Sequence, residues 1–186
     1  MWGKNVIFVE SYEGGGCAGV EVQRNKTDAM KTCLLVIGKT DADYVRRGIE
    51  EYEKRLRRYI PFEMKVLPDV KNAKSMGEAL QKEKEGEMIL EQLAPTDTVV
   101  LLDEKGRQYT SVEFSAYLAQ KMLGGTKRLV FVVGGPYGFS EAVYRRGNEK
   151  ISLSKMTFSH QMVRMIFAEQ IYRAMTILKG EPYHHE

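Results

Sequence analysis

The sequence predicts an α/β domain with a largely parallel sheet that is covered by helices on both faces. Short apolar runs alternate along the chain with longer stretches in which apolar residues recur at helical spacing. Continuous apolar runs are typical of strands buried on both faces, as the strands of parallel sheets are. With 186 residues, 43% of them hydrophobic, the chain is long enough for one well-buried core.

Apolar runs mark the expected strands. The first covers residues 33–37 and ends at Gly38, which suits the turn behind a buried strand. The second, at residues 62–67, alternates between apolar and polar side chains. The remaining expected strands are residues 98–102, 129–133 and 151–153.

A helix is expected after each of these strands. In the first helix, apolar side chains recur at helical spacing, and the Arg and Glu residues between them indicate a solvated face. These apolar positions are Tyr44, Val45, Ile49, Tyr52 and Leu56. The other expected helices are residues 76–93, 112–123, 140–146 and 161–178.

Composition and charge restrict the cellular compartment and the partners that we expect for this protein. A net charge of +3 permits an RNA partner without demanding one. The two cysteines, Cys17 and Cys33, are too few for a disulfide framework and lack the spacing of a zinc site. The chain has neither an apolar run of about 18 residues nor the basic-then-apolar order of a secretory signal. We therefore expect a soluble, cytoplasmic protein that does not contact a membrane.

The first 29 residues differ from the rest of the chain. They hold one short apolar run, three consecutive glycines at residues 14–16 and no sustained period. We expect them to be an extension upstream of a functional domain at residues 30–186, arising from an over-called start codon or a cloning remnant. The competing interpretation is an authentic arm that pairs with the edge of the sheet.

Three loops are expected at the carboxyl ends of strands, where ligands gather in α/β sheets: residues 101–106, 134–138 and 154–159. In the second loop, Gly134 and Gly135 would allow a flat ligand to approach the backbone, or would adopt positive φ angles. The alternative is that GGPYG is only a tight turn. Its pattern is neither a dinucleotide fingerprint nor a phosphate loop.

Several polar residues near the C-terminus have a structural and a functional interpretation. Ser159 stands where a helix cap is expected, which alone would explain a serine there. Charges at the spacing of Arg164, Glu169 and Arg173 usually form a solvated face or an ion-paired set. The histidine pair that begins at His184 resembles a disordered end or a tag fragment, although the preceding Pro-Tyr is unusual for a purification tag.

These motifs together resemble one family. GGPYG, a short helix and SLSKMTFSHQMVRMIFAEQIYRAMTILKGEPYHHE are similar to the C-terminal half of the bacterial 23S rRNA (pseudouridine(1915)-N3)-methyltransferases, the small SPOUT enzymes. The opening MKTCLLVIGKTDADYVRRGIEEYEKRLRRYIPFEMKVLPD resembles their first strand, helix and second strand. The similarity covers residues 30–186, and the first 29 residues fall outside it.

The resemblance implies a SPOUT fold with a C-terminal trefoil knot, a rare exception to unknotted topology. It implies S-adenosylmethionine as cofactor, a homodimer completed by the partner's tail, and a substrate pseudouridine in helix 69 of 23S rRNA within the assembled ribosome. DNA, membrane and metal are not expected to take part. The implied cofactor residues are Leu102, Gly134, Gly135, Ser154, Lys155, Met156, Thr157, Phe158 and Ser159.

The reaction requires a general base, because N3 of a pseudouridine must lose its proton before it attacks the methyl group. His184 is the first candidate, since neutral imidazole is available near pH 7. Tyr183 would position or stack on the base, and Arg173 would bind a phosphate or the uracil-like carbonyls. Two alternatives stay open: a SPOUT methyltransferase for transfer RNA or another ribosomal site, and a non-catalytic ribosome-binding factor.

Overall fold

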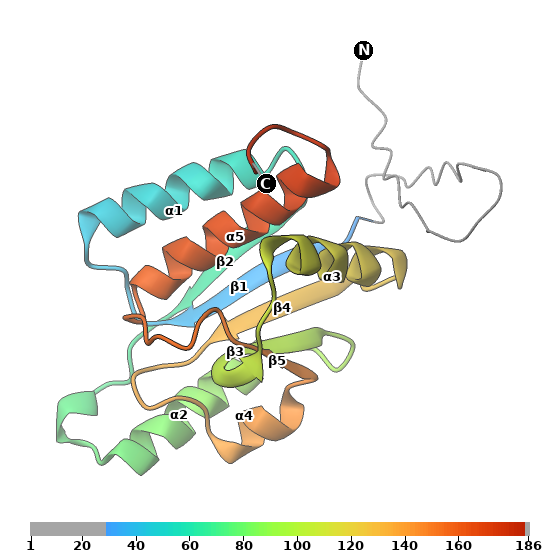
Figure 1. Ribbon diagram of the computed structural model, residues 1–186. Coiled ribbons are helices and arrows are strands. Elements are labelled where there is room, and N and C mark those ends of the chain that lie inside the picture. Colours follow the sequence, from blue (N-terminus) through green and yellow to red (C-terminus); the bar gives the residue numbers. More distant parts are fainter. Residues whose placement is uncertain (1–28, 185–186) are drawn as a thin grey trace.

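The computed structural model describes residues 29–184, so most of the expected extension, Cys17 included, lies outside the described residues. The described chain forms one five-stranded sheet in which every pairing of neighbouring strands is parallel (Figure 1). The strand order is β2-β1-β4-β3-β5. The strands are β1 (Lys31–Ile37), β2 (Phe62–Leu67), β3 (Thr98–Arg107), β4 (Arg128–Val133) and β5 (Glu149–Ile151).

Helices cover both faces of the sheet, as predicted (Figure 1). One face carries α1 (Asp43–Leu56), α3 (Ser111–Leu123) and α5 (Met162–Leu178), with α5 packed between the other two. The opposite face carries α2 (Glu78–Leu90) and α4 (Glu141–Arg146), which contact each other. A short 3-10 helix, η2 (Ala73–Ser75), precedes α2. Within residues 29–184 no helix is both long and apolar enough to cross a membrane.

Alternation along the central strands divides the core into two clusters, because successive side chains of a strand point to opposite faces. In β1, Leu34 and Val36 belong to the cluster under α1, α3 and α5, whereas Leu35 and Ile37 belong to the cluster under α2 and α4. In β4, Phe131 packs on Phe167 of α5 with ring centroids 4.7 Å apart. Both layers consist mainly of buried apolar side chains, and the carboxyl ends of the strands emerge between them.

The observed elements differ from the predicted ones at a few places. Tyr44 is 66% exposed rather than part of the apolar face of α1, and its hydroxyl lies 3.6 Å from the sulfur of Met162. β3 runs five residues beyond the predicted end at residue 102, because Arg107 pairs again with Ile151 after an irregularity in the ladder. β5 begins two residues earlier than predicted.

Candidate functional site

A cleft of about 670 Å³ opens at the carboxyl ends of β3, β4 and β5. This size falls in the range of small-molecule sites, about 300–1,000 Å³. All nine residues that the sequence nominated for the cofactor line it: Leu102, Gly134, Gly135, Ser154, Lys155, Met156, Thr157, Phe158 and Ser159. The three loops expected to hold a ligand therefore surround one space.

The GGPYG loop at the end of β4 is both a tight turn and a wall of the cleft. The amide of Gly138 donates a hydrogen bond to the carbonyl of Gly135, 3.2 Å away. Positive φ occurs at Gly138 (79°), whereas Gly134 and Gly135 do not have it. The suggestion that the first two glycines are needed for positive φ is therefore wrong, because the left-handed residue closes the turn at its last position.

The other reason given for a glycine at position 135 is a close approach to its backbone. In the structure, the group that approaches belongs to α2. A Cβ at Gly135 would stand 2.1 Å from Oε2 of Glu85. Glu85 is only 3% exposed, and Gln81 donates a hydrogen bond to its Oε1 at 2.8 Å. Oε2 has no hydrogen-bond partner among the described residues. Burial raises the pKa of Glu85, and the charge of Asp69 adds to the rise.

Sequence reasoning missed Glu85. It lies in a helix with many Lys and Glu residues, where one buried carboxyl is not distinguishable from its solvated neighbours. The adjacent glycine is the available signal: a Cβ at Gly86 would stand 2.2 Å from Oγ of Ser140, so α2 approaches the start of α4 closely here. An isolated glycine inside a helical pattern often has such a packing reason.

The loop at residues 154–159 forms another wall of the cleft and leads into α5. Oγ of Ser159 accepts a hydrogen bond from the amide of Met162 at 3.2 Å. The N-cap of α5 is Gln161, without a side-chain cap bond, so Ser159 does not occupy the expected cap position. Its hydroxyl instead bonds to the first residue of the helix, and the residue also lines the cleft.

Arg164 anchors the end of this loop to β1. Its side chain is fully buried (1% exposed), so its assignment to a solvated face is wrong. Nε donates to the carbonyl of His160 (2.9 Å), and Nη1 donates to the carbonyl of Gly38 (2.8 Å) and Oγ1 of Thr40 (2.9 Å). Nη2 donates to the carbonyl of Ile37. Burial lowers the pKa of Arg164, while nearby aspartates act in the opposite direction.

The residues nominated for catalysis lie together at the carboxyl end of α5. Arg173 forms an ion pair with Glu169 one turn earlier, with Nη2 and Oε1 2.6 Å apart, which confirms the ion-paired interpretation for these two. Nη1 of Arg173 is 3.4 Å from Nδ1 of His184. The hydroxyl of Tyr183 donates to Oε1 of Glu169 at 3.2 Å, so Glu169 joins the group.

Tyr183 is placed to donate a hydrogen bond rather than to accept a proton. Burial raises the pKa of its phenol above the usual range, and the hydroxyl of Tyr52 and the charge of Glu169 raise it further. The Arg173 guanidinium lies over the Tyr183 ring, 4.8 Å from the centroid. The tyrosine therefore stays protonated at neutral pH and fixes the orientation of its neighbours.

Within one chain, the cleft and this tail cluster are separate. Of the described residues that line the cleft, the last along α5 is Val163. Arg173 lies ten residues further on, about 15 Å along the helix axis. In Figure 1 the described end of the chain lies at the far end of α5 from the loop that precedes this helix. Arg173, Tyr183 and His184 are thus brought together with one another but not with the cofactor residues.

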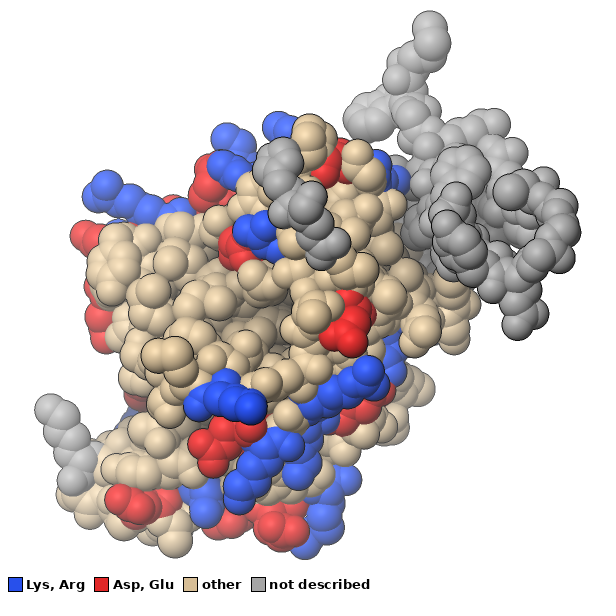
Figure 2. Space-filling view, viewed as in Figure 1, with Lys and Arg blue, Asp and Glu red and all other residues tan. Residues whose placement is uncertain are grey.

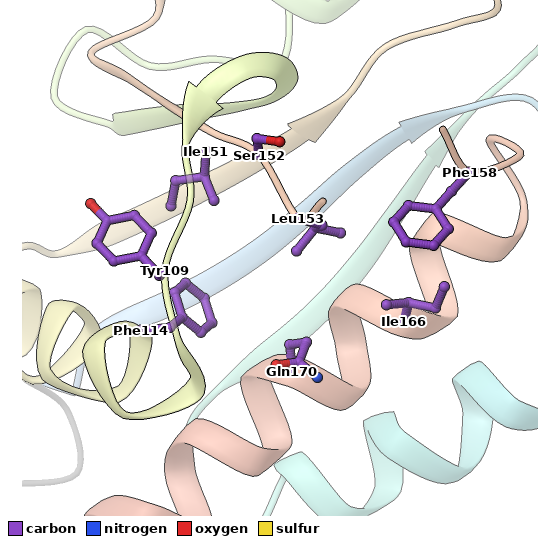
Figure 3. Close-up of a pocket in the computed structure, with 8 residues that line it drawn as sticks. All are labelled: Tyr109, Phe114, Ile151, Ser152, Leu153, Phe158, Ile166 and Gln170. Carbon is purple, nitrogen blue, oxygen red and sulfur yellow. The ribbon is translucent and has the colours of Figure 1, made fainter. Parts of the chain in front are cut away.

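A second, smaller cavity of about 190 Å³ adjoins the cleft (Figure 3). The two hollows share Ile151, Ser152, Leu153 and Phe158. The other walls of the small cavity come from Tyr109 and α3 on one side and from α5 on the other (Figure 3). Between residues 29 and 184 no group of three or more His, Cys, Asp or Glu side chains is arranged to hold a metal ion.

These features define an α/β protein with a ligand site at the carboxyl ends of parallel strands. The family described as "Predicted SPOUT methyltransferase" matches residues 30–184. Proteins named "Ribosomal RNA large subunit methyltransferase H" are similar over 157 residues, which is 84% of this chain and all of each relative: 69% identical in Parabacteroides distasonis, 60% in Bacteroides thetaiotaomicron and 57% in Porphyromonas gingivalis. The chain belongs to the SPOUT methyltransferase family.

Proposed function

We propose that this protein methylates N3 of the pseudouridine at position 1915, in helix 69 of 23S ribosomal RNA, with S-adenosylmethionine as the methyl donor. The observation that carries the proposal is the cleft at the carboxyl ends of β3, β4 and β5, which all nine nominated cofactor residues line. The names of its relatives support large-subunit ribosomal RNA as the substrate class.

The cleft suits S-adenosylmethionine. Its walls combine apolar side chains such as Leu102, Met156 and Phe158 with the exposed backbone of the GGPYG turn. An adenine ring needs such flat, apolar walls and a few backbone donors and acceptors. The cofactor would supply an activated methyl group on sulfur. The protein would hold that group and the attacking nitrogen in line, and would accept the proton from N3.

We propose that the active site is composite, with the tail cluster of one subunit of a homodimer facing the cleft of the other. The separation of about 15 Å along α5 supports this arrangement, because one chain does not join the two clusters. His184 would accept the N3 proton. Arg173, held by Glu169, would bind a phosphate or a carbonyl of the nucleotide. Tyr183, whose hydroxyl donates to Glu169, would position or stack on the base.

Three structural proposals accompany this function. The segment after β4 would form the trefoil knot of SPOUT enzymes. The functional domain would begin at Met30 and run to Glu186, with residues 1–29 as an extension, and the start of the family match at residue 30 supports this boundary. A ribosomal substrate would place the protein in the cytoplasm, acting on assembled ribosomes.

Methyl transfer to ribosomes tests the function. Intact 70S ribosomes from a bacterium that lacks the modification would be incubated with the full chain and labelled S-adenosylmethionine, and the modified nucleotide would be mapped. We expect one methyl group at N3 of the helix 69 pseudouridine. Methylation of transfer RNA or of another ribosomal site would favour the first alternative, and binding to ribosomes without transfer would favour a non-catalytic factor.

A further inference from the structure

Four exposed basic side chains border the two hollows. Lys105 and Lys155 line the cleft directly. Lys150 precedes Ile151, and Arg107 pairs with Ile151 across β3 and β5, while Ile151 itself lines both hollows. We call Lys105, Arg107, Lys150 and Lys155 the basic rim. Figure 2 shows Lys and Arg side chains in a band, with Asp and Glu side chains between them, over the part of the molecule where β3, β5 and α4 lie.

The basic rim differs from the basic side chains of α1 in its ion pairing. None of its four members forms an ion pair between residues 29 and 184. On α1, by contrast, Arg55 pairs with Glu51 and Arg46 pairs with Asp43. A cluster of like charges is unfavourable unless an anion compensates it. The rim therefore offers cations without ion-pair partners beside the cleft, with the carboxylate of Glu113 near Arg107.

Two acidic residues near the rim have partners of their own. Glu149 forms an ion pair with Lys121 of α3. Asp103 accepts hydrogen bonds from the hydroxyl of Tyr144 (2.6 Å) and from the backbone amide of Lys105 (2.8 Å). Glu104 is the one acidic residue of the β3 extension that is exposed and makes no side-chain ion pair in the described chain. The four basic side chains therefore have no ion pairs among the described residues, and the carboxylates of Asp103, Glu104 and Glu113 lie near them.

Two tyrosines hold rim cations in place. Lys150 Nζ lies 4.7 Å from the centroid of the Tyr144 ring, and Arg107 Cζ lies 4.6 Å from the centroid of the Tyr109 ring. Tyr144 lines the cleft and Tyr109 lines the small cavity. Burial, with the hydrogen bond to Asp103, raises the pKa of Tyr144 to about 12, so the ring stays neutral and does not repel an anion. Such contacts reduce the freedom of long side chains before a ligand arrives.

We propose that the basic rim is a phosphate-binding track, which holds the backbone of the substrate RNA along β3 and β5 while the target base enters the cleft. This inference rests on the proposed function, because it assumes an RNA substrate. Unpaired Lys and Arg side chains next to aromatic rings are typical of surfaces that follow a nucleic-acid backbone. The rim would position RNA without reading its sequence, since phosphate contacts carry no sequence information.

The test removes two rim charges outside the nominated cofactor residues. Arg107→Gln/Lys150→Gln would be compared with Lys31→Gln/Lys127→Gln, which removes two exposed charges from the amino ends of β1 and β4, at the opposite end of the sheet. The charge-keeping variant Arg107→Lys/Lys150→Arg completes the set. Methyl transfer to unmodified 70S ribosomes and cosedimentation with them would be measured across a series of salt concentrations, together with S-adenosylmethionine binding.

We expect the rim variant to raise the KM for ribosomes about tenfold and to lower the salt slope of binding by roughly 0.7–0.9 for each lost phosphate contact. Its kcat and its affinity for S-adenosylmethionine should stay unchanged. The opposite-end variant and the charge-keeping variant should behave as the wild type. A rim variant with the KM and salt slope of the opposite-end variant would overturn the inference. A wild-type protein that transfers no methyl group to ribosomes would instead overturn the proposed function, and cosedimentation would still test the rim.

Discussion

Arg164 and Glu85 are ionisable side chains buried near the carboxyl end of the sheet, and each lies against a loop that lines the cleft. Arg164 connects the end of β1 to the last residue of the loop that precedes α5. Glu85 stands behind Gly135. Neither role could be predicted from the sequence, because the acceptors of Arg164 on β1 lie more than 120 residues away. The periodicity of a sequence shows how residues are spaced within one helix or strand, and it carries no information on contacts between distant segments.

Replacing Arg164 with Met should destabilise the fold. The change leaves the buried backbone carbonyls of Ile37 and Gly38, and the part-buried carbonyl of His160, without these donors, which costs about 2–4 kcal/mol. Urea denaturation would measure the loss in the free energy of unfolding. Arg47→Met, at an exposed position of α1, is the matched control and should change stability by less than about 0.5 kcal/mol. Equal losses in the two variants would contradict the anchoring role of Arg164.

Glu85 should make stability depend on pH. Its pKa in the folded state is raised from the ordinary 4.5, so the folded protein binds this proton more tightly than the unfolded chain does. Below the ordinary pKa both states hold the proton and no stability is lost. As the pH rises through the folded pKa, the buried carboxyl ionises at a cost and stability falls.

Glu85→Gln keeps the shape of the protonated side chain and removes the ionisation. The free energy of unfolding of Glu85→Gln minus that of the wild type should therefore grow as the pH rises from 4 to 8. Urea denaturation at four or five pH values would measure it. A difference that stays constant, or shrinks toward pH 8, would show that burial does not raise the pKa of Glu85.

At the scale of elements, the sequence predicted most helices and strands to within one or two residues. β2 matches its prediction at both ends, and β1, α3 and α5 differ by a residue or two at the start. These elements have strong apolar periods of their own. The extension of β3 over residues 103–107 was missed, because DEKGR has no strand pattern and is extended only through its pairing with Ile151. Non-local pairing of this kind leaves no local signal.

The turn at the end of β4 allows the effect of backbone strain to be tested without a steric collision. Gly138 has φ 79°, and a Cβ added there would meet no atom within 4 Å. Gly138→Ala should therefore cost about 1 kcal/mol through strain rather than collision. Because this turn forms a wall of the cleft, the change should also weaken S-adenosylmethionine binding several-fold, as measured by calorimetry.

Gly125 offers a matched control, since its φ is 77° and its Cβ position is also open. It lies in the link between α3 and β4 and does not line the cleft. Gly125→Ala should lose a similar amount of stability and keep wild-type affinity for the cofactor. If both variants bind S-adenosylmethionine as the wild type does, the conformation of the GGPYG turn does not matter for the ligand.

At the scale of the whole molecule, the sequence predicted which residues surround the cleft but not how far the tail cluster lies from it. The three loops were placed together because carboxyl ends of parallel strands meet at one edge. The tail cluster was nominated from its position in the motif and from the chemistry of its residue types. Its distance from the cleft depends on the length of α5, and a single chain leaves Arg173 about 15 Å along the helix from the last cleft residue.

Mixed dimers test the composite site directly. Gly135→Val should abolish cofactor binding, because its side chain collides with Glu85 and displaces the turn. His184→Ala should bind the cofactor but slow methyl transfer by roughly 10²-fold, if it removes the general base. Each variant alone should therefore be nearly inactive. Circular dichroism and sedimentation would establish that both variants are folded and dimeric.

Coexpression of the two variants should restore activity, because a mixed dimer joins the intact cleft of the His184→Ala chain to the intact tail of the Gly135→Val chain. Random pairing makes half of the dimers mixed, and each mixed dimer holds one intact site of two. Methyl transfer to ribosomes should therefore recover to about a quarter of the wild-type rate, as expected for a two-fold symmetric pair. If each site were formed within one chain, every chain in the mixture would carry a defect, and no activity beyond that of the separate variants would appear.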